Sequence, residues 1–356
     1  MIAVADALKA PIVHALRGKE YIEYDNPFDV GMTGLLGFSS GYFAIMDCDV
    51  LLMLGTDFPY QQFYPEKAAI VQVDLRPENL GRRTRLSLGL IGDVNDTLAA
   101  LLPLLKPKQD RIHLDKALRH YASNRAGLDA LATGTPGRKP IHPQYLTRIV
   151  NEFSTPDEIF TADVGSPTMW AARYLTMNGK RRLLGSFNHG SMANAMPQAI
   201  GAQLTYPERQ VISLSGDGGF SMLMGDFLTI RQLKLPIKII LFNNGALAFV
   251  ELEMKAAGLL EHGTTLDNPN FAQMAEAIGI RGIRVEDPGD VKGAVREAFD
   301  HEGPVLIDAL VNRQELSMPP TIQFSQAMGF TLYMLKAVFN GKGDEVLDLA
   351  KTNLWR

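Results

Sequence analysis

Two stretches decide the fold of this chain: VISLSGDGG at residues 211–219 and IKIILFNNG at residues 237–245. Each is a short apolar run, rich in β-forming residues, that ends in small polar residues, with Asp217 after the first run and Asn244 after the second. Apolar residues at mostly helical spacing predict a helix over residues 220–234 between them. The pattern predicts a strand–turn–helix–strand unit, whose two strands must run parallel.

The polar ends of both runs predict a site for a cation and a phosphate group. Ligands of parallel sheets bind beyond the carboxyl ends of the strands, where both ends fall. Mg²⁺ prefers oxygen ligands and usually shares them with phosphates, and Asp217 and Asn244 offer one charged and one neutral oxygen. The glycines allow backbone N–H groups to approach phosphate oxygens closely. Either half alone is more often an ordinary turn, but the two at matching strand ends favour a bound Mg²⁺ and diphosphate.

These motifs resemble those of thiamine-diphosphate (ThDP) enzymes, the family that includes pyruvate oxidases, acetolactate synthases and pyruvate decarboxylase. Three further stretches carry the resemblance: DVGSPT at 163–168, GSFNHGSMANAMP at 185–197 and LAKTNLWR at 349–356. The last makes the chain similar to the quinone-dependent pyruvate dehydrogenases, flavoenzymes that dock on membranes. The resemblance implies an α/β fold with two doubly wound parallel-sheet domains, an FAD-binding central domain and a ThDP diphosphate-binding domain, plus a helical C-terminal tail.

The resemblance also assigns roles at the ThDP site. It implies that Asp217, Asn244 and the backbone carbonyl of Ala246 bind Mg²⁺. Met192 would hold the cofactor in a bent shape, and Phe249 corresponds to an aromatic residue that moves into the active site on activation. The residue types alone favour ordinary core packing for Met192 and Phe249. The other residues implied to contact ThDP are Gly190, Ser191, Gly218, Gly219, Gly245, Leu247, Ala248 and Val250.

The first hundred residues also have an α/β pattern. Buried-type strands are predicted at 11–16, 50–54 and 69–74, and Asp74 ends the third. A carboxylate there can accept a ribose hydroxyl, or it can simply cap the strand end. The resemblance implies that FAD contacts Thr33, Gly34, Leu35, Leu36, Gly37, Phe38, Phe58, Pro59, Tyr60, Gln61, Gln62, Asp74 and Arg76.

Length and composition limit the possible functions. A chain of 356 residues predicts two or three domains, and 46% apolar and 21% charged residues are typical of a globular protein. The net charge of −4 gives no support to nucleic-acid binding, and the single Cys48 excludes an intramolecular disulfide. The sequence has neither an apolar run near 18 residues nor a signal peptide. We therefore expect a cytoplasmic protein, peripheral on the inner face of the cell membrane by resemblance.

We expect four segments along the chain. Residues 1–105 would form part of the central FAD-binding domain, and 106–140 a connection with an amphipathic helix over 114–131 and a linker. Residues 141–316 would form the ThDP diphosphate domain, and 317–356 an amphipathic tail. Amphipathicity alone fits docking on the protein's own core as well as on a membrane, whereas the resemblance favours reversible membrane contact.

The resemblance predicts that half of the catalytic site comes from elsewhere. Family chemistry needs a glutamate from an N-terminal pyrimidine-binding domain of a partner subunit, and Met1 falls inside the flavin-domain match. We therefore expect a fragment or misassigned start, or a chain that pairs with a separately made domain, inactive by itself. The predicted function is ThDP- and FAD-dependent oxidation of pyruvate to acetate and CO₂, with electrons passed to ubiquinone by a tetramer. The alternatives are an acetolactate synthase-type carboligase and a non-catalytic FAD- or lipid-binding module.

Overall fold

The computed structural model describes residues 1–313, 315, 324–339, 346 and 349. It divides into two compact units, one formed by residues 1–127 and one by the described residues from Leu128 onward. Each unit is α/β with parallel strands, which confirms the α/β fold class with parallel sheets. The boundaries of the four predicted segments stay predictions.

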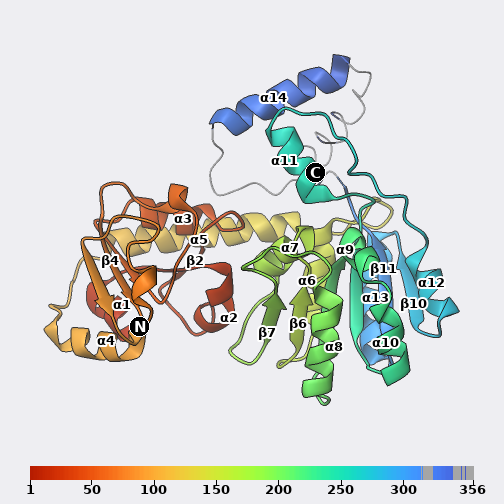
Figure 1. The fold of residues 1–356 in the computed structure, drawn as a ribbon, viewed down its shortest axis with the longest axis horizontal. Helices are drawn as coiled ribbons and strands as arrows, with labels where there is room; N and C mark the ends of the chain where they lie inside the picture. Colours follow the sequence, from red (N-terminus) through yellow and green to blue (C-terminus); the bar gives the residue numbers. More distant parts are fainter. Residues whose placement is uncertain (314, 316–323, 340–345, 347–348, 350–356) are drawn as a thin grey trace. The chain divides into compact units, whose positions relative to one another are not determined.

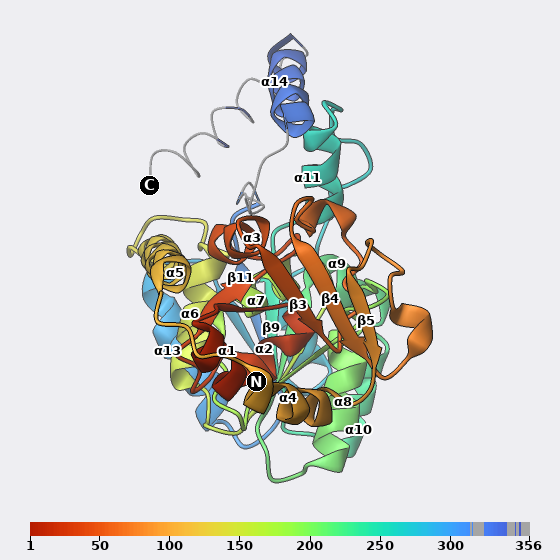
Figure 2. The same cartoon turned by 90° about the vertical axis from the view of Figure 1, so that its left-hand side faces the viewer.

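The first unit contains two parallel sheets. One pairs β1 (Ile12–His14) with β2 (Asp29–Met32). The other joins β3 (Val50–Leu54), β4 (Ala69–Asp74) and β5 (Leu88–Ile91) in that order, as Figure 2 shows. The helices are α1 (Ile2–Leu8), α2 (Lys19–Ile22), α3 (Ser39–Met46), α4 (Val94–Leu101) and α5 (Ile112–Leu131), which continues into the second unit. Short 3₁₀ turns lie at Leu16–Gly18, Gln61–Phe63, Pro77–Asn79 and Leu102–Leu104.

The three strands predicted in this unit are confirmed, and two more are present. The first ends at His14, earlier than expected, because a 3₁₀ turn begins at Leu16. The additional strand β5, Leu-Gly-Leu-Ile, is apolar in sequence but lies at the edge of its sheet, and its four residues are all exposed. The predicted amphipathic helix is confirmed as α5, whose Leu114 and Ala117 are buried in this unit's core.

The second unit is built on a six-stranded parallel sheet with the order β10-β11-β9-β8-β6-β7 (Figure 1). The strands are β6 (Ile159–Ala162), β7 (Arg182–Gly185), β8 (Val211–Gly216), β9 (Lys238–Asn243), β10 (Arg281–Val285) and β11 (Val305–Leu310). The helices are α6 (Pro143–Phe153), α7 (Ser166–Tyr174), α8 (Ala195–Thr205), α9 (Asp217–Met222), α10 (Asp226–Leu233), α11 (Ala248–Ala256), α12 (Phe271–Ala277), α13 (Val291–Asp300) and α14 (Phe324–Phe339). A 3₁₀ turn at Pro288–Asp290 precedes α13.

The strand order reverses inside this sheet. From β6 the chain moves outward to the edge strand β7, then returns past β6 to form β8 on its other side. Ligands of open parallel sheets bind beyond the carboxyl ends of the strands at such a reversal. The reversal therefore lies where Ala162 and Gly216 end β6 and β8.

The predicted strand–turn–helix–strand unit is confirmed in its strands. Strands β8 and β9 run parallel with Gly216 opposite Phe242, and their apolar residues are buried on both faces. The single helix predicted over residues 220–234 is wrong, because α9 begins at Asp217 and ends at Met222, and α10 starts only at Asp226. Gly225, a poor helix former, lies at the interruption. As a result Phe227 enters the core while Met222 stays exposed.

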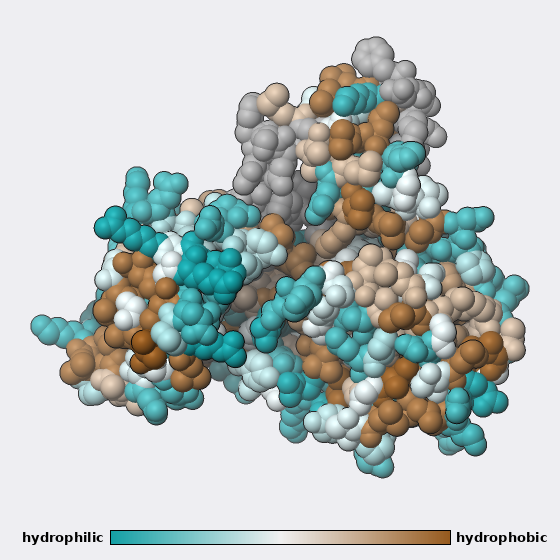
Figure 3. Space-filling model, in the orientation of Figure 1, coloured by the Kyte–Doolittle hydropathy of each residue, from teal (hydrophilic) through white to brown (hydrophobic). Residues whose placement is uncertain are grey.

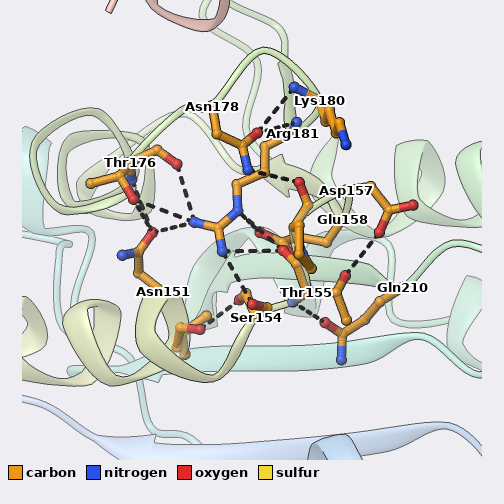
Figure 4. Close-up of polar contacts among 12 residues, drawn as sticks. Asn151, Ser154, Thr155, Asp157, Glu158, Thr176, Asn178, Lys180, Arg181 and Gln210 are labelled. Carbon is orange, nitrogen blue, oxygen red and sulfur yellow. Dashed lines mark hydrogen bonds and ion pairs between the residues drawn. The ribbon is translucent and has the colours of Figure 1, made fainter. Parts of the chain in front are cut away.

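The amino ends of β6 and β7 are joined by a buried ion pair, shown in Figure 4. Arg181 Nε lies 2.5 Å from Glu158 Oε1, and the Glu158 side chain is fully buried. The same guanidinium donates to the backbone carbonyls of Ser154, Thr155 and Thr176. This arginine therefore fixes the loops that enter both strands.

Helix α14 packs on α11 within the second unit. Tyr333 is buried with Lys255 Nζ 5.3 Å from its ring centre, and Lys336 donates to the Gly258 carbonyl at 2.8 Å. None of the described helices has the length and apolar content needed to cross a membrane. Most of the remaining predicted tail, including Trp355, lies outside the described residues.

Candidate functional site

The carboxyl ends of β8 and β9 bring the two halves of the sequence motif together. Asp217 directly follows β8 as the first residue of α9, and Asn244 directly follows β9. The Gly245 N–H donates to Asp217 Oδ2 at 2.7 Å. The turn after one strand thus hydrogen-bonds the turn after its neighbour, as the predicted site requires.

The Asp217 carboxylate is buried and held by uncharged donors. Its Oδ1 accepts from the Gly218 N–H at 2.9 Å, and its Oδ2 accepts from Gly245 and from Asn268 Nδ2 at 2.8 Å. Burial raises the pKa of Asp217, while these N–H donors act in the opposite direction. The Asn244 N–H also acts on this carboxylate. Of the three hydrogen bonds above, Oδ2 accepts two and Oδ1 accepts one, so Oδ1 is the oxygen better placed to bind a cation.

The oxygen atoms around Asp217 fit Mg²⁺. Asn244 Oδ1 accepts from the Ala246 N–H at 3.0 Å, which fixes the amide and leaves its second lone pair. Gly245 and Leu247 pair with residues 264–266 through the Gly245 carbonyl and the Leu247 N–H, so this pairing does not use the Ala246 carbonyl. The described residues contain no group of three His, Cys, Asp or Glu side chains suited to a metal. A cation held by Asp217, Asn244 and Ala246 therefore matches Mg²⁺, which accepts few carboxylates and keeps phosphate and water ligands.

The loop between β7 and α8 carries the predicted residues Gly190, Ser191 and Met192. Gly190 has φ +69° and its N–H donates to the Ser186 carbonyl at 2.7 Å, which forms a tight turn that favours glycine. Met192 is half-buried rather than part of the core. A Cβ atom placed on Gly218 would lie 3.3 Å from Met192 Cε and 2.8 Å from Leu247 Cδ2. Three predicted residues from three separate segments therefore meet at Gly218.

Asp163 organises this loop, although the sequence assigned it no role. It follows β6 and accepts from the Ala195 N–H at 2.9 Å and the Gly216 N–H at 3.3 Å. A Cβ atom on Gly219 would lie 2.4 Å from Asp163 Oδ2, so glycine is required there for packing as well as for access. Burial raises the pKa of Asp163 to about 6. Its place after β6, beside the strand-order reversal, is the signal that could have identified it.

Phe249 lies on α11 together with Ala248 and Val250. It is half-buried and lines a small cavity of about 30 Å³ with Met169 and Trp170 of α7. Glu251, two residues further along the same helix, is buried between two cations. Its Oε1 lies 2.5 Å from Lys255 Nζ, and its Oε2 lies 3.0 Å from Arg313 Nε. The geometry places Phe249 beside α7 and does not bring it into contact with Asp217.

Two models of thiamine-pyrophosphate enzymes match the chain. Residues 163–309 match the thiamine pyrophosphate enzyme C-terminal TPP-binding domain, and residues 1–101 match the thiamine pyrophosphate enzyme central domain. The chain belongs to the ThDP-dependent enzyme family. The polar site at β8 and β9 lies inside the matched TPP-binding domain.

Relatives support the same family. The chain is 34% identical over 354 residues to the putative thiamine pyrophosphate-containing protein YdaP of Bacillus subtilis, covering 99% of this chain and 61% of that protein. It is 31% identical over 328 residues to the acetolactate synthase large subunit of Porphyra purpurea, covering 89% of this chain and 55% of that protein. It is 64% identical over 140 residues to an uncharacterized 42.6 kDa protein of Pseudomonas amyloderamosa, covering 39% of this chain and 35% of that protein. The chain thus spans about three fifths or less of these relatives.

An apolar surface follows the Gly-Asp-Gly turn of this ThDP-family domain. Met222, Leu223, Met224 and Leu228 are exposed, and Figure 3 shows brown surface where Figure 1 places α9 and α10. Most large apolar side chains are buried, so a cluster of exposed ones is characteristic of a surface that contacts another protein or membrane.

The segments predicted to contact FAD lie together in the first unit, which matches the family's central domain. Residues 34–37 form a turn after β2, and a Cβ atom on Gly34 (φ +98°) would lie 3.2 Å from the Phe58 ring. Thr33 Oγ1 is buried without a hydrogen-bond partner among the described residues, whereas Leu35 and Tyr60 are exposed. An unpaired buried hydroxyl beside exposed apolar side chains fits a ligand that is partly aromatic and partly polar. These segments therefore fit a flavin.

The other residues predicted there are Leu36, Gly37 and Phe38 beside the first turn, and the exposed Pro59, Gln61 and Gln62 after Phe58.

Asp74 and Arg76 lie at the end of β4 in this central domain. Asp74 Oδ1 accepts from the Arg76 N–H at 2.9 Å, and Oδ2 accepts from Asn79 Nδ2 at 3.2 Å. The carboxylate thus caps its own strand end, the simpler of the two interpretations. Arg76 is exposed.

Proposed function

We propose that the whole protein catalyses the ThDP- and Mg²⁺-dependent decarboxylation of pyruvate. The observation that carries this proposal is the hydrogen bond between Asp217 and Gly245 at the strand-order reversal of a matched TPP-binding domain. Bound ThDP would supply a nucleophilic carbon for attack on the 2-oxo acid.

The residues of this chain would bind and orient the cofactor. Asp217, Asn244 and the Ala246 carbonyl would hold Mg²⁺, and through it the diphosphate. Met192 would set the cofactor's bend, because its side chain reaches the Gly218 turn. The exposed apolar residues of α9 and α10 would contact the domain that supplies the activating glutamate, from a partner subunit of a tetramer or from a separately made chain.

We propose that the two electrons released on oxidation to acetate pass to FAD in the central domain and then to ubiquinone. Support comes from the fit of the 33–38 and 58–62 segments to a flavin and from the resemblance of the tail. Helix α14 exposes Met328, Leu332, Leu335 and Val338 while burying Tyr333 and Ala337, which supports lipid contact by residues 317–356 at the inner face of the cell membrane. Removal of residues 317–356 should abolish sedimentation with liposomes, and unchanged sedimentation would contradict the lipid contact.

An acetolactate synthase-type carboligase is the second candidate. Its support is the set of relatives named acetolactate synthase, at 30–31% identity over 89–90% of this chain. A non-catalytic FAD- or lipid-binding module is the third, since the activating glutamate is not assigned to any residue of this chain. The products formed from pyruvate distinguish the three.

The test supplies ThDP, Mg²⁺, FAD, ferricyanide and pyruvate to the purified chain, with and without a pyrimidine-binding domain from a relative. We expect acetate once that domain is present, loss of acetate in Asp217→Asn, and no change in Asp300→Asn, which alters an exposed carboxylate at the end of α13. Acetolactate in place of acetate would favour the carboligase. Bound ThDP with neither product would favour the non-catalytic module, and turnover that survives Asp217→Asn would overturn the proposed site.

A further inference from the structure

A chain of hydrogen-bonded polar side chains runs from Asp217 across the sheet to β10. We propose that Asn268 and Asp308 are positioning residues that present Asp217 Oδ1 to the cation, an inference that rests on the cation site proposed above. Neither residue belongs to the Gly-Asp-Gly or Asn-Asn stretches, and 51 and 91 positions separate them from Asp217. An unbroken series of hydrogen bonds nevertheless links both residues to Asp217.

Asn268 contacts both halves of the motif with one amide nitrogen. Its Nδ2 donates to Asp217 Oδ2 at 2.8 Å and to Asn243 Oδ1 at 3.0 Å. An amide nitrogen carries two hydrogens, so one is available for each acceptor. The two acceptors fix which end of the Asn268 amide faces the site.

Asn243 is oriented in turn from the neighbouring strand. It ends β9 and is buried, and its Nδ2 donates to Asp308 Oδ1 at 2.8 Å. Because its nitrogen faces Asp308, its oxygen faces Asn268. The carboxylate of Asp308 therefore determines that Asn243 acts as the acceptor.

Asp308 lies in β11 and is fully buried. Its Oδ2 accepts from the Phe271 N–H at 3.1 Å and from Arg284 Nη1 of β10 at 2.9 Å. Phe271 begins α12, three residues after Asn268. Asp308 thus holds both Asn243, which accepts from the Asn268 amide, and the start of the helix that follows Asn268. Both contacts constrain the position of the Asn268 side chain.

The consequence for Asp217 follows from its acceptor positions. With Asn268 and Gly245 both donating to Oδ2, that oxygen accepts two hydrogen bonds, whereas Oδ1 accepts one, from Gly218, and is the oxygen turned to the cation. Without Asn268, either oxygen can face the cation and the carboxylate is less well oriented. Residues that orient metal ligands through hydrogen bonds typically contribute about 10–100-fold to metal affinity.

The test measures Mn²⁺ binding to the full chain in the presence of ThDP, by electron paramagnetic resonance, with thermal unfolding recorded for every variant. We expect Asn268→Ala to weaken Mn²⁺ binding by at least about tenfold. The matched control is Asn270→Ala, in the same loop, whose Oδ1 accepts from the Gln273 N–H at 3.0 Å as the cap of α12. That variant should lower the unfolding temperature without changing Mn²⁺ affinity.

Asp308→Asn tests the chain of contacts separately. If the new amide oxygen keeps Phe271 and Arg284 as donors, its nitrogen faces Asn243 and reverses that amide, which removes the acceptor for Asn268. Mn²⁺ binding should weaken by several-fold in Asp308→Asn and by no further amount when Asn268→Ala is already present. Asp308→Asn by itself carries the test if Asn268→Ala does not fold.

Each outcome has a definite meaning. Equal Mn²⁺ affinity in Asn268→Ala and the unsubstituted chain, or equal weakening in Asn270→Ala, would overturn the positioning role while leaving the cation site intact. Additive losses in the double variant would overturn the route through Asp308. Absence of Mn²⁺ binding in the unsubstituted chain would overturn the cation site itself, before any substitution is compared.

Discussion

The two ends of the six-stranded sheet hold buried carboxylates in contrasting surroundings. At the amino ends, Glu158 lies against the guanidinium of Arg181, which also donates to three backbone carbonyls. At the carboxyl ends, the recorded donors to Asp163 and Asp217 are backbone N–H groups and one amide, none of them charged. The first arrangement contains its own cation, whereas the second retains an acceptor position for one.

This contrast separates a structural network from a binding site. Burial raises the pKa of Glu158 to about 7, with Arg181 acting in the opposite direction, so the ion pair offsets part of the cost of burial. Asp217 has no such partner recorded among the described residues, and burial dominates its pKa shift. A bound divalent cation would stabilise that carboxylate, which is why we assign function to the carboxyl ends only.

Loss of the arginine at the amino ends should have the largest effect. Arg181→Leu leaves Glu158 and three carbonyls without their donor, so the free energy of unfolding should fall by about 3–5 kcal/mol in urea denaturation. The loss should be greater at pH 8 than at pH 5, because Arg181 holds the pKa of Glu158 down and its removal lets that pKa rise further. The neighbouring Lys180→Leu, at an exposed position, should change stability by less than about 0.5 kcal/mol.

Arg181→Leu also tests whether the amino ends of the sheet are independent of the cation site at its carboxyl ends. Mn²⁺ and ThDP binding by folded Arg181→Leu should equal that of the unsubstituted chain. A marked loss of affinity would show that the amino-end network supports the cation site, and the contrast between the ends would then fail.

The sequence predicts local features of this molecule better than distant contacts. Strands β8 and β9 were predictable because continuous apolar runs end in Gly-Asp-Gly and Asn-Asn, and parallel strands bring their carboxyl ends together. Asn268 lies in a polar stretch, DNPN, that is typical of a turn, and its contact with Asp217 depends on the order of β8, β9 and β11. Strand order is set by the packing of the whole sheet, so no local pattern identifies Asn268 or Asp308.

The broken helix after Asp217 shows the same limit. Spacing alone favoured one helix over residues 220–234, because its apolar residues recur at mostly helical intervals: Met222, Leu223, Phe227, Ile230 and Leu233. Only Phe227 and Ile230 reach the core, while Met222 is exposed beside the site. Periodicity cannot distinguish an apolar residue that packs inside from one that contacts a partner.

The pH dependence of stability sharpens the contrast at the carboxyl ends. The Asp163 carboxyl has an ordinary pKa of 3.8, raised by burial to about 6 in the folded chain. Between these values the unfolded chain binds fewer protons, so the free energy of unfolding should fall as pH rises, by up to about 3 kcal/mol. Asp163→Asn removes this dependence, and its stability relative to the unsubstituted chain should therefore improve from pH 4 to pH 7. Parallel stability curves for the two proteins would show that Asp163 is not destabilised by burial.

The smallest expected effect tests how tightly the carboxyl ends are packed. Gly219→Ala would place a Cβ atom 2.4 Å from Asp163 Oδ2 and 3.0 Å from the Ala193 nitrogen, so the loop must shift at a cost of about 1–3 kcal/mol. Gly225→Ala, six residues further on, is the matched control, because nothing lies within 4 Å of its Cβ position and its φ of −57° suits alanine. That control should keep or raise stability by up to about 1 kcal/mol. If both variants unfold at the same urea concentration, the glycine beside Asp163 is not needed for packing, and its presence must then be explained by access of the diphosphate alone.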